Sequence, residues 1–217
     1  MKVGTDGVLL GAWANLTDSK IICDIGTGTG LIAIVAAQSN SIAQIIAIEI
    51  DGKASEQAKL NAQNCTWGKR IEVYHYDFNE IFLKYKPDHF ISNPPYFKAE
   101  SLAKGASRVL ARQTVSLNLK QLLFNCKRLG AEKHLLSLII PIDLFENSQH
   151  DFKSFGYFVS RIQMVKPTPA KAPKRVLLEL RNYECELKQE KDLVIETQRH
   201  VYTPEYIDLC RDFYLKM

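Results

Sequence analysis

IICDIGTGTGLIAIVAAQ, residues 21–38, is the stretch that most strongly indicates the fold. An apolar run (21–26) ends in a glycine-rich turn, and the residues that follow (31–38) are apolar and rich in helix formers. Glycines at such a turn let the backbone pass close to a ligand, and the N-terminus of the next helix favours negative charge. The stretch therefore predicts a β-strand, a ligand-binding turn and an α-helix in succession.

The same alternation of strands and helices continues along the chain. Further strands are predicted at residues 44–51, 70–77, 88–93 and 135–141, and further helices at residues 53–64, 117–129 and from about residue 204. Strands that are apolar on both faces and alternate with helices form a parallel sheet covered on both sides.

Two later segments differ, because residues 161–165 and 176–182 alternate apolar with polar side chains. This pattern predicts an antiparallel strand pair at one end of the sheet. The predicted fold class is therefore α/β: a seven-stranded, mostly parallel sheet with helices on both faces. A length of 217 residues favours one domain spanning 1–217.

Composition narrows the class of protein. Apolar residues make up 46% of the chain, which is enough for a packed core, and no apolar run approaches the roughly 20 residues of a membrane span. Thr5 and Asp6 interrupt the apolar start where a signal peptide would be continuous, so a cytoplasmic location is expected. Five scattered cysteines without a CxxC pair predict reduced thiols and no metal site.

Positive charge is concentrated in two segments. Residues 98–133 contain eight Lys or Arg and two Glu, and residues 161–181 contain six Lys or Arg and one Glu, whereas the whole chain has a net charge of only +4. Such asymmetry indicates a side that faces a polyanion. The alternative is that these lysines only solvate helix faces.

The glycine turn favours one of two ligand classes. Dinucleotide sites use G-x-G-x-x-G, whereas this turn reads G-x-G-x-G and has Leu31 at the third dinucleotide glycine. A ligand without phosphates, such as S-adenosylmethionine, suits this spacing. Glu49 ends the second strand, where acids accept the hydroxyls of a ribose, and Asp77 ends the third, within reach of an adenine amino group. The alternatives are that the glycines only form a tight turn, that Glu49 is a solvated acid at a strand end, and that Asp77 is an ordinary turn aspartate.

The sequence SNPPYF, residues 92–97, closes the fourth predicted strand. The two prolines stiffen the corner and offer carbonyls without N–H groups. An exocyclic amine could donate its two protons to the side-chain oxygen of Asn93 and the carbonyl of Pro94, with Tyr96 stacking on the ring and Phe97 lining the pocket. The alternative is a simple strand-terminating turn. If the sheet reverses beside its first strand, Asn93 emerges beside the glycine turn.

These motifs together resemble the class I S-adenosylmethionine-dependent methyltransferases with an [N/D]-P-P-[Y/F/W] signature, whose fold is Rossmann-like. Within them the chain is similar to the bacterial tRNA(Val) adenine-N6 methyltransferases, which modify the adenine next to the anticodon. The segments that carry the likeness are MKVGTDGVLLGAWA (1–14), DIGTGTGLIAI (24–34), AIEID (47–51), SNPPYF (92–97) and YTPEY…DFYLKM (202–217).

The resemblance implies a set of site residues, with S-adenosyl-L-methionine as cofactor, tRNA as partner, no metal and a monomer as the default state. The implied catalytic residues are Asn93, Pro94, Pro95 and Tyr96. The implied cofactor-binding residues are Thr5, Asp6, Gly7, Asp24, Gly26, Gly28, Gly30, Glu49, Ile50, Asp77, Phe78 and Asn93. Candidate RNA contacts are Phe97, Lys104, Arg108, Arg112, Lys166, Lys171, Lys174 and Arg175.

Four other functions stay open at this point. The same signature serves enzymes that methylate a glutamine amide in release factors and enzymes that methylate adenine in DNA, although the first usually carry an extra helical domain and the second a separate recognition region. A non-catalytic RNA-binding module is opposed by the intact glycine turn and Asn93. A dinucleotide oxidoreductase is opposed by the spacing of the glycines.

Overall fold

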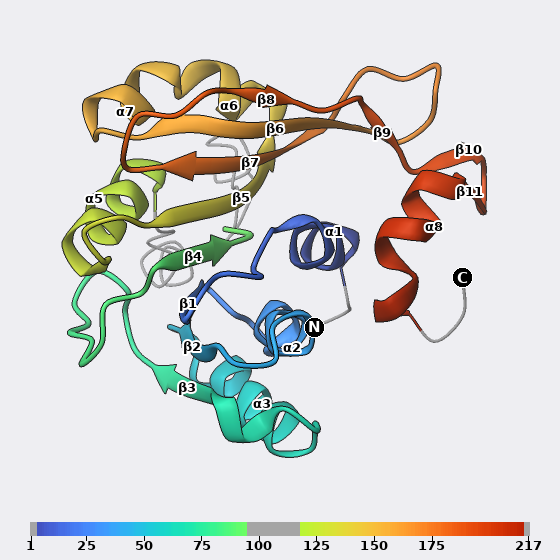
Figure 1. The fold of residues 1–217 in the computed structure, drawn as a ribbon. Helices are drawn as coiled ribbons and strands as arrows, with labels where there is room; N and C mark the ends of the chain where they lie inside the picture. The colour runs from blue at the N-terminus through green and yellow to red at the C-terminus, as the bar shows by residue number, and fades with distance from the viewer. Residues whose placement is uncertain (1–3, 95–117, 215–217) are drawn as a thin grey trace, which may run out of the picture.

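The computed structural model describes residues 4–94 and 118–214, and Figure 1 shows their arrangement around one twisted sheet. The longer strands are β1 (Ile21–Ile25), β2 (Gln44–Glu49), β3 (Ile71–His75), β4 (His89–Ser92), β5 (Leu135–Pro141), β6 (Phe158–Lys166) and β7 (Arg175–Arg181). Short strands are β8 (Lys188–Gln189), β9 (Leu193–Val194) and the hairpin of β10 (Glu196–Gln198) and β11 (Val201–Tyr202). The helices are α1 (Thr5–Trp13), α2 (Leu31–Ser39), α3 (Gly52–Gln63), α5 (Leu119–Leu129), α6 (Ile142–Asn147), α7 (Gln149–Ser154) and α8 (Pro204–Cys210), with short 3-10 turns η1 (Gly68–Arg70) and η3 (Arg211–Phe213).

The strand order of the main sheet is β3-β2-β1-β4-β5-β7-β6-β8, with β9 beside β6. The first five strands in this order are mutually parallel, and β7 runs antiparallel to both of its neighbours. The predicted α/β class and the antiparallel pairing of β6 with β7 are confirmed. The order of strands reverses between β1 and β4, as the site prediction required.

The sheet differs from the prediction in two details. Two added strands of two residues each, β8 and β9, bring the described sheet to nine strands instead of seven. Strand β7 lies inside the sheet and is buried from Val176 to Leu180, although its alternating pattern predicted a half-polar strand at the sheet's end. The buried Glu179 is accommodated because the Ser160 hydroxyl and the Arg181 guanidinium both donate to it.

Two apolar cores cover the two faces of the sheet. One contains side chains of α1, α2 and α8, and the other contains side chains of α5 and α7. Neighbouring residues of β1 illustrate the division, because Ile22 belongs to the first core and Cys23 to the second. Side chains alternate between the faces of a strand, so a strand that is buried on both sides is mostly apolar, and its few polar residues need hydrogen-bond partners.

Helix α1 is an element that the sequence pattern did not predict. Its residues Val8, Leu9, Leu10 and Trp13 are all buried, so the helix shows no polar face by which an amphipathic period could be recognised. The helix also lies very close to α2, because a Cβ atom at Gly11 would come within 2.6 Å of Cγ1 of Val35. Its close fit against α2 brings the N-terminal segment to the glycine turn.

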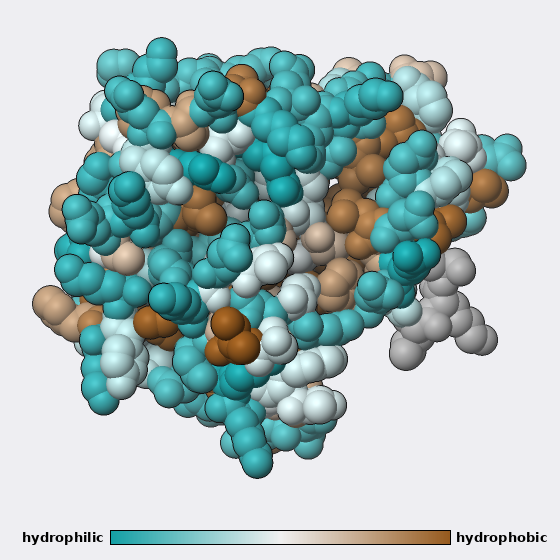
Figure 2. All heavy atoms as spheres, viewed as in Figure 1, coloured by the Kyte–Doolittle hydropathy of each residue, from teal (hydrophilic) through white to brown (hydrophobic). Residues whose placement is uncertain are grey.

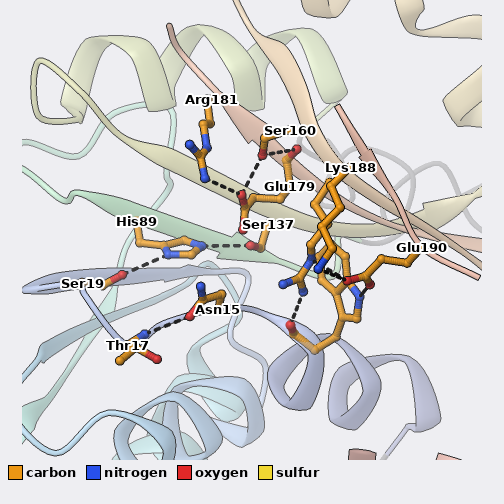
Figure 3. A network of polar contacts seen from close by, with 12 residues as sticks. Asn15, Thr17, Ser19, His89, Ser137, Ser160, Glu179, Arg181, Lys188 and Glu190 are labelled. Carbon is orange, nitrogen blue, oxygen red and sulfur yellow. Dashed lines mark hydrogen bonds and ion pairs between the residues drawn. The ribbon is translucent and has the colours of Figure 1, made fainter. Parts of the chain in front are cut away.

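A buried polar network crosses the sheet at the edge where its parallel strands begin (Figure 3). His89 lies between two hydroxyls: Ser19 is 3.0 Å from its Nδ1 and Ser137 is 2.9 Å from its Nε2. Burial lowers the pKa of His89 to about 3, so the ring is neutral in the folded protein. The network thereby connects the segment just before β1 to β4 and β5.

The exterior is mostly hydrophilic in Figure 2; a group of apolar residues is visible between α1 and the C-terminal elements, and smaller groups lie on the left and at the lower centre. None of the helices among the described residues is long and apolar enough to span a bilayer.

Candidate active site

The glycine turn follows β1 at the carboxyl edge of the parallel strands. Gly26, Gly28 and Gly30 have φ angles of 69°, 60° and 89°, a region that side chains other than glycine rarely enter. The turn is anchored to β2, because the amides of Gly26 and Thr27 donate to the carbonyl of Ile48 at 2.9 and 3.0 Å. The three glycines are therefore required by the backbone path itself.

Glu49 stands opposite this turn at the end of β2. Its Oε2 accepts a hydrogen bond of 2.7 Å from the amide of Gly28, and its Oε1 accepts one of 2.9 Å from the amide of Asp51. The residue is only 9% exposed. A carboxylate has about four lone-pair positions, so each oxygen can accept a further hydrogen bond from a ligand. Beside it, Ile50 is 54% exposed and offers an apolar surface.

Asp24, the last polar residue before the turn, is completely buried. The Thr27 hydroxyl donates to its Oδ2, whereas Oδ1 has no hydrogen bond of normal geometry within the described residues. Burial raises the pKa of Asp24 to about 7, and the nearby Glu49 carboxylate adds to this, against the Thr27 hydroxyl and the Ala33 amide, which lower it. The site thus contains a buried carboxyl group, one oxygen of which accepts no well-aligned hydrogen bond from the described residues.

Asn93 lies beside the glycine turn at the same edge of the sheet. Strands β1 and β4 are parallel neighbours with Asp24 opposite Ile91, and the Ser92 hydroxyl donates to the carbonyl of Ile25 at 2.7 Å. The next residues along each strand are Asn93, which is half-buried, and Gly26. The structure therefore brings together the amide and the glycine turn.

Asp77, just beyond β3, has its side chain fixed by neighbouring amides. Its Oδ1 accepts from the backbone amide of Asn79 at 2.8 Å and from Asn79 Nδ2 at 2.9 Å. Asn79 in turn accepts a 3.0 Å bond from Asn125 on α5. The Phe78 side chain is buried edge-on against Phe90, so only its backbone is available to a ligand.

The segment Thr5–Gly7 forms the first turn of α1 and lies against α2. A Cβ atom at Gly7 would be 3.3 Å from the side chain of Leu31, the first residue of α2 after the glycine turn. The Asp6 carboxylate accepts a 2.9 Å bond from Nε of Arg175. Arg175, expected to contact RNA, is thus paired with a residue expected to contact the cofactor.

The remaining expected residues fall into two groups. Lys171 and Lys174 are exposed between β6 and β7, and Lys166 forms a 2.6 Å ion pair with Asp192. Six others lie outside the described residues: Pro95, Tyr96, Phe97, Lys104, Arg108 and Arg112. Pro94 is described and buried.

Sequence reasoning missed the residues that support the site. Ser92 joins two strand ends, and Asn125 holds Asn79 and through it Asp77. A hydroxyl within the apolar run HFIS is a weak signal for Ser92, whereas Asn125 looks like an ordinary polar position of a helix. Within the described parts of the chain, no group of three or more His, Cys, Asp and Glu side chains could hold a metal ion.

Comparison with known proteins places the chain in a family. The family model for the methyltransferase small domain matches residues 4–121. A protein of Bacteroides fragilis (strain YCH46), named tRNA1(Val) (adenine(37)-N6)-methyltransferase, is 43% identical over 220 residues, covering 100% of this chain and 92% of its own. Proteins of the same name from Trichodesmium erythraeum and Vibrio campbellii are 40% and 38% identical over 100% of this chain and 92% and 90% of their own.

Solved structures show the same fold at low sequence identity. A predicted O-methyltransferase from Agrobacterium tumefaciens superposes with a TM-score of 0.74 at 21% identity, over 95% of this chain and 96% of its own. A ribosomal protein L11 methylase from Lactobacillus delbrueckii subsp. bulgaricus gives a TM-score of 0.58 at 15% identity, over 82% of this chain and 77% of its own. With this Rossmann-like class I methyltransferase fold, the chain belongs to the methyltransferase small domain family and, within it, to the family of proteins named tRNA1(Val) (adenine(37)-N6)-methyltransferase.

Proposed function

We propose that this protein is a single-domain enzyme that transfers a methyl group from S-adenosylmethionine to the exocyclic N6 amine of an adenine in tRNA, the adenine next to the anticodon of tRNA(Val). The observation that carries the proposal is the parallel pairing of β1 and β4. At the ends of these strands the Ser92 hydroxyl donates a hydrogen bond to the Ile25 carbonyl, and the next residue, Asn93, lies beside the glycine turn. Identity to the relatives so named, over the whole chain, supports the choice of substrate.

The residues at the carboxyl edge fit this cofactor. The Oδ1 of Asp24 suits the ammonium group of the cofactor's methionine part, because a cation stabilises a buried carboxylate. Glu49 would accept the ribose hydroxyls, and Ile50 would pack on the adenine. Asp77 would accept from the adenine amino group, and Thr5–Gly7 would lie over the methionine end.

The proposed chemistry needs orientation more than proton transfer. When bound, the cofactor supplies a methyl group on a sulfonium ion. The Asn93 side-chain oxygen and the Pro94 carbonyl would accept the two N–H groups of the target amine, which turns its lone pair out of the ring and toward that methyl. Holding the reactants in line in this way supplies most of the rate gain. The methylated nitrogen then loses a proton readily, so no strong base is required.

A direct test is incubation of the protein and labelled cofactor with unmodified total tRNA, and in a parallel reaction with a release factor, followed by nucleoside analysis of the RNA and counting of label in the protein. We expect N6-methyladenosine in the tRNA(Val) fraction and no label in a release factor. Heat stabilisation by S-adenosylmethionine but not by NAD is the companion measurement, because only a ligand that binds the folded state raises the melting temperature. Label in protein instead of RNA would contradict the proposal.

The titration of Asp24 gives a prediction for cofactor binding. Between pH 5.5 and 7 the cofactor's α-amino group stays protonated, while Asp24, with a pKa of about 7, gains charge as the pH rises. We expect cofactor affinity to increase about tenfold over this range, because the cation binds the ionised carboxyl. Calorimetry at several pH values would measure it. The Asp24→Asn variant should bind weakly with a flat profile, and an equally steep profile in that variant would contradict the assignment.

The exposed lysines between β6 and β7 give a prediction for RNA binding. Affinity should fall as salt rises, because each neutralised phosphate releases counterions. Lys171→Ala and Lys174→Ala are each expected to reduce the slope of log affinity against log salt by about 1. Lys59→Ala, on the exposed side of α3, is the matched control and should leave the slope unchanged. Fluorescence anisotropy with labelled tRNA would measure these slopes, and a flat salt dependence would exclude both lysines.

A further inference from the structure

Three exposed aromatic side chains lie around α5 and the connection from β3 to β4. Phe82 is 88% exposed, and Tyr85 and Phe124 are each 56% exposed. On the left of Figure 2, over these elements, apolar atoms lie among hydrophilic ones. Single exposed apolar residues are ordinary on a protein surface, so the grouping matters more than any one of the three.

Cations accompany two of these rings. The guanidinium carbon of Arg128 lies 5.7 Å from the centre of the Phe82 ring, and Nζ of Lys84 lies 5.0 Å from that of Tyr85. Both separations are within the range of cation–π attraction. Aromatic rings next to cations are the combination by which proteins hold single-stranded nucleic acid, since bases stack and phosphates pair with the charges.

The connection that carries Phe82 is fastened to α5. Arg128 donates from Nη1 to the carbonyl of Ile81 at 3.2 Å and from Nη2 to that of Asn79 at 3.3 Å. Its Nε donates to Asn125 Oδ1 at 2.9 Å. Ile81, next to Phe82, is buried in the core. The ring is thus presented on a fixed backbone, which lowers the entropy that a partner must overcome on binding.

The exposed side of α5 leads from Phe82 to the edge of the sheet that bears Asn93. Residues 120, 124 and 128 are spaced by four and share one side of the helix. The helix ends close to the start of β5, where Leu135 bonds to the carbonyl of Asp88 at the amino edge. Its first residues therefore lie toward the carboxyl edge, about 16 Å away along the helix axis.

The charge along this side suits a polyanion. Residues 118–130 contain Lys120, Lys127 and Arg128 and no acid. Lys120 makes a 3.3 Å ion pair with Asp151, but its side chain remains 65% exposed, so the pair is weak and a phosphate can compete for the lysine. These cations belong to the more N-terminal of the two basic segments in the sequence.

We propose that a surface on α5 and the β3–β4 connection, termed the α5 face, binds the single-stranded RNA that flanks the target adenine. The α5 face consists of Phe82, Lys84, Tyr85, Lys120, Phe124 and Arg128. Bases stack on Phe82 and Phe124 while the cations contact phosphates, and the strand leads along α5 toward Asn93. This inference rests on the proposed function, since it assigns the docking site of the same RNA substrate.

The test compares variants of Phe82 in the full chain with an unmodified tRNA(Val) transcript. Phe82→Ala is expected to raise the KM for RNA about tenfold, the effect of losing one stacked base, with kcat and the KM for S-adenosylmethionine unchanged. Phe82→Trp should restore the wild-type KM, whereas Phe82→Leu should not, because only an aromatic face stacks. The double variant with Phe124→Ala should raise the KM further. The matched control is Ile42→Ala, which removes a 72% exposed side chain between α2 and β2.

The possible outcomes separate this inference from the proposed function. A wild-type KM for RNA in the double variant, with methylation intact, would overturn the α5 face and leave the proposed function standing. Altered sedimentation of the variants with unchanged RNA affinity would assign the surface to a second copy of the chain and would equally overturn it. A wild-type protein that binds S-adenosylmethionine but methylates no RNA would remove the proposed function itself.

Discussion

Replacing Asn93 with alanine is expected to lower kcat for RNA methylation about 10²- to 10³-fold, the loss seen when one preorganised polar group is removed from a reacting centre. The physical reason is that the target amine loses the oxygen that orients its lone pair, while the groups that hold the cofactor stay in place. Asn93 follows Ser92, whose bond to Ile25 is unaffected by the change. Cofactor affinity should therefore remain near its wild-type value.

Single-turnover rates with saturating cofactor and tRNA, together with calorimetric cofactor affinity, would measure both halves of this result. Asn93→Asp should keep more activity than Asn93→Ala, because a carboxylate oxygen still accepts from the amine. Asn15→Ala is the matched control: Asn15 is an exposed asparagine near the opposite edge of the sheet. A normal rate in Asn93→Ala would show that the amide does not hold the substrate.

Replacing Glu49 with alanine is expected to weaken cofactor binding about 100-fold, which corresponds to roughly 3 kcal/mol for hydrogen bonds to a charged group. The ribose would lose its acceptor, and the amides of Gly28 and Asp51 would lose theirs, so the glycine turn would also be less firmly held. The KM for RNA should change little, because Glu49 ends β2, whereas the proposed RNA contacts lie on α5 and in the β3–β4 and β6–β7 connections.

Calorimetry with the methylated cofactor and with its demethylated product would measure the Glu49 effect. Glu56→Ala, an exposed acid on α3, should bind the cofactor normally. Glu49→Gln should fall between alanine and wild type, since one oxygen remains to accept. Equal affinity in Glu49→Ala and wild type would withdraw the ribose assignment.

Most of the strands and helices were predictable because the sequence signals that mark them are local. Strands buried on both faces are continuous apolar runs, and helix α5 begins with a capping box in which Asn118 and Gln121 bond each other's backbone. The C-terminal helix begins at Pro204 as predicted, with Thr203 as its cap. Each of these signals lies within a few residues of the element that it marks.

The features that escaped prediction depend on contacts between distant residues. Arg175 looked like a free cation in a basic loop, yet it pairs with Asp6, which lies 169 positions earlier in the chain. Glu179 looked like a solvent-facing residue, yet Ser160 and Arg181 accommodate it inside the sheet. The proximity of Asn93 to the glycine turn, by contrast, was predicted on condition that the strand order reverses beside β1, and that reversal is present.

The placement of His89 between two serines has a consequence for acid lability. The pKa of His89 is about 6.5 in the unfolded chain and about 3 in the folded protein, so on acidification the unfolded chain takes up this proton first. The free energy of unfolding therefore decreases as the pH falls below about 6.5. Asp24 acts in the opposite sense: its raised pKa means that acidification from about pH 7 favours the folded state. A bound sulfonium cofactor would hold Asp24 ionised and remove that compensation, so the loaded protein should lose stability on acidification more steeply than the free protein.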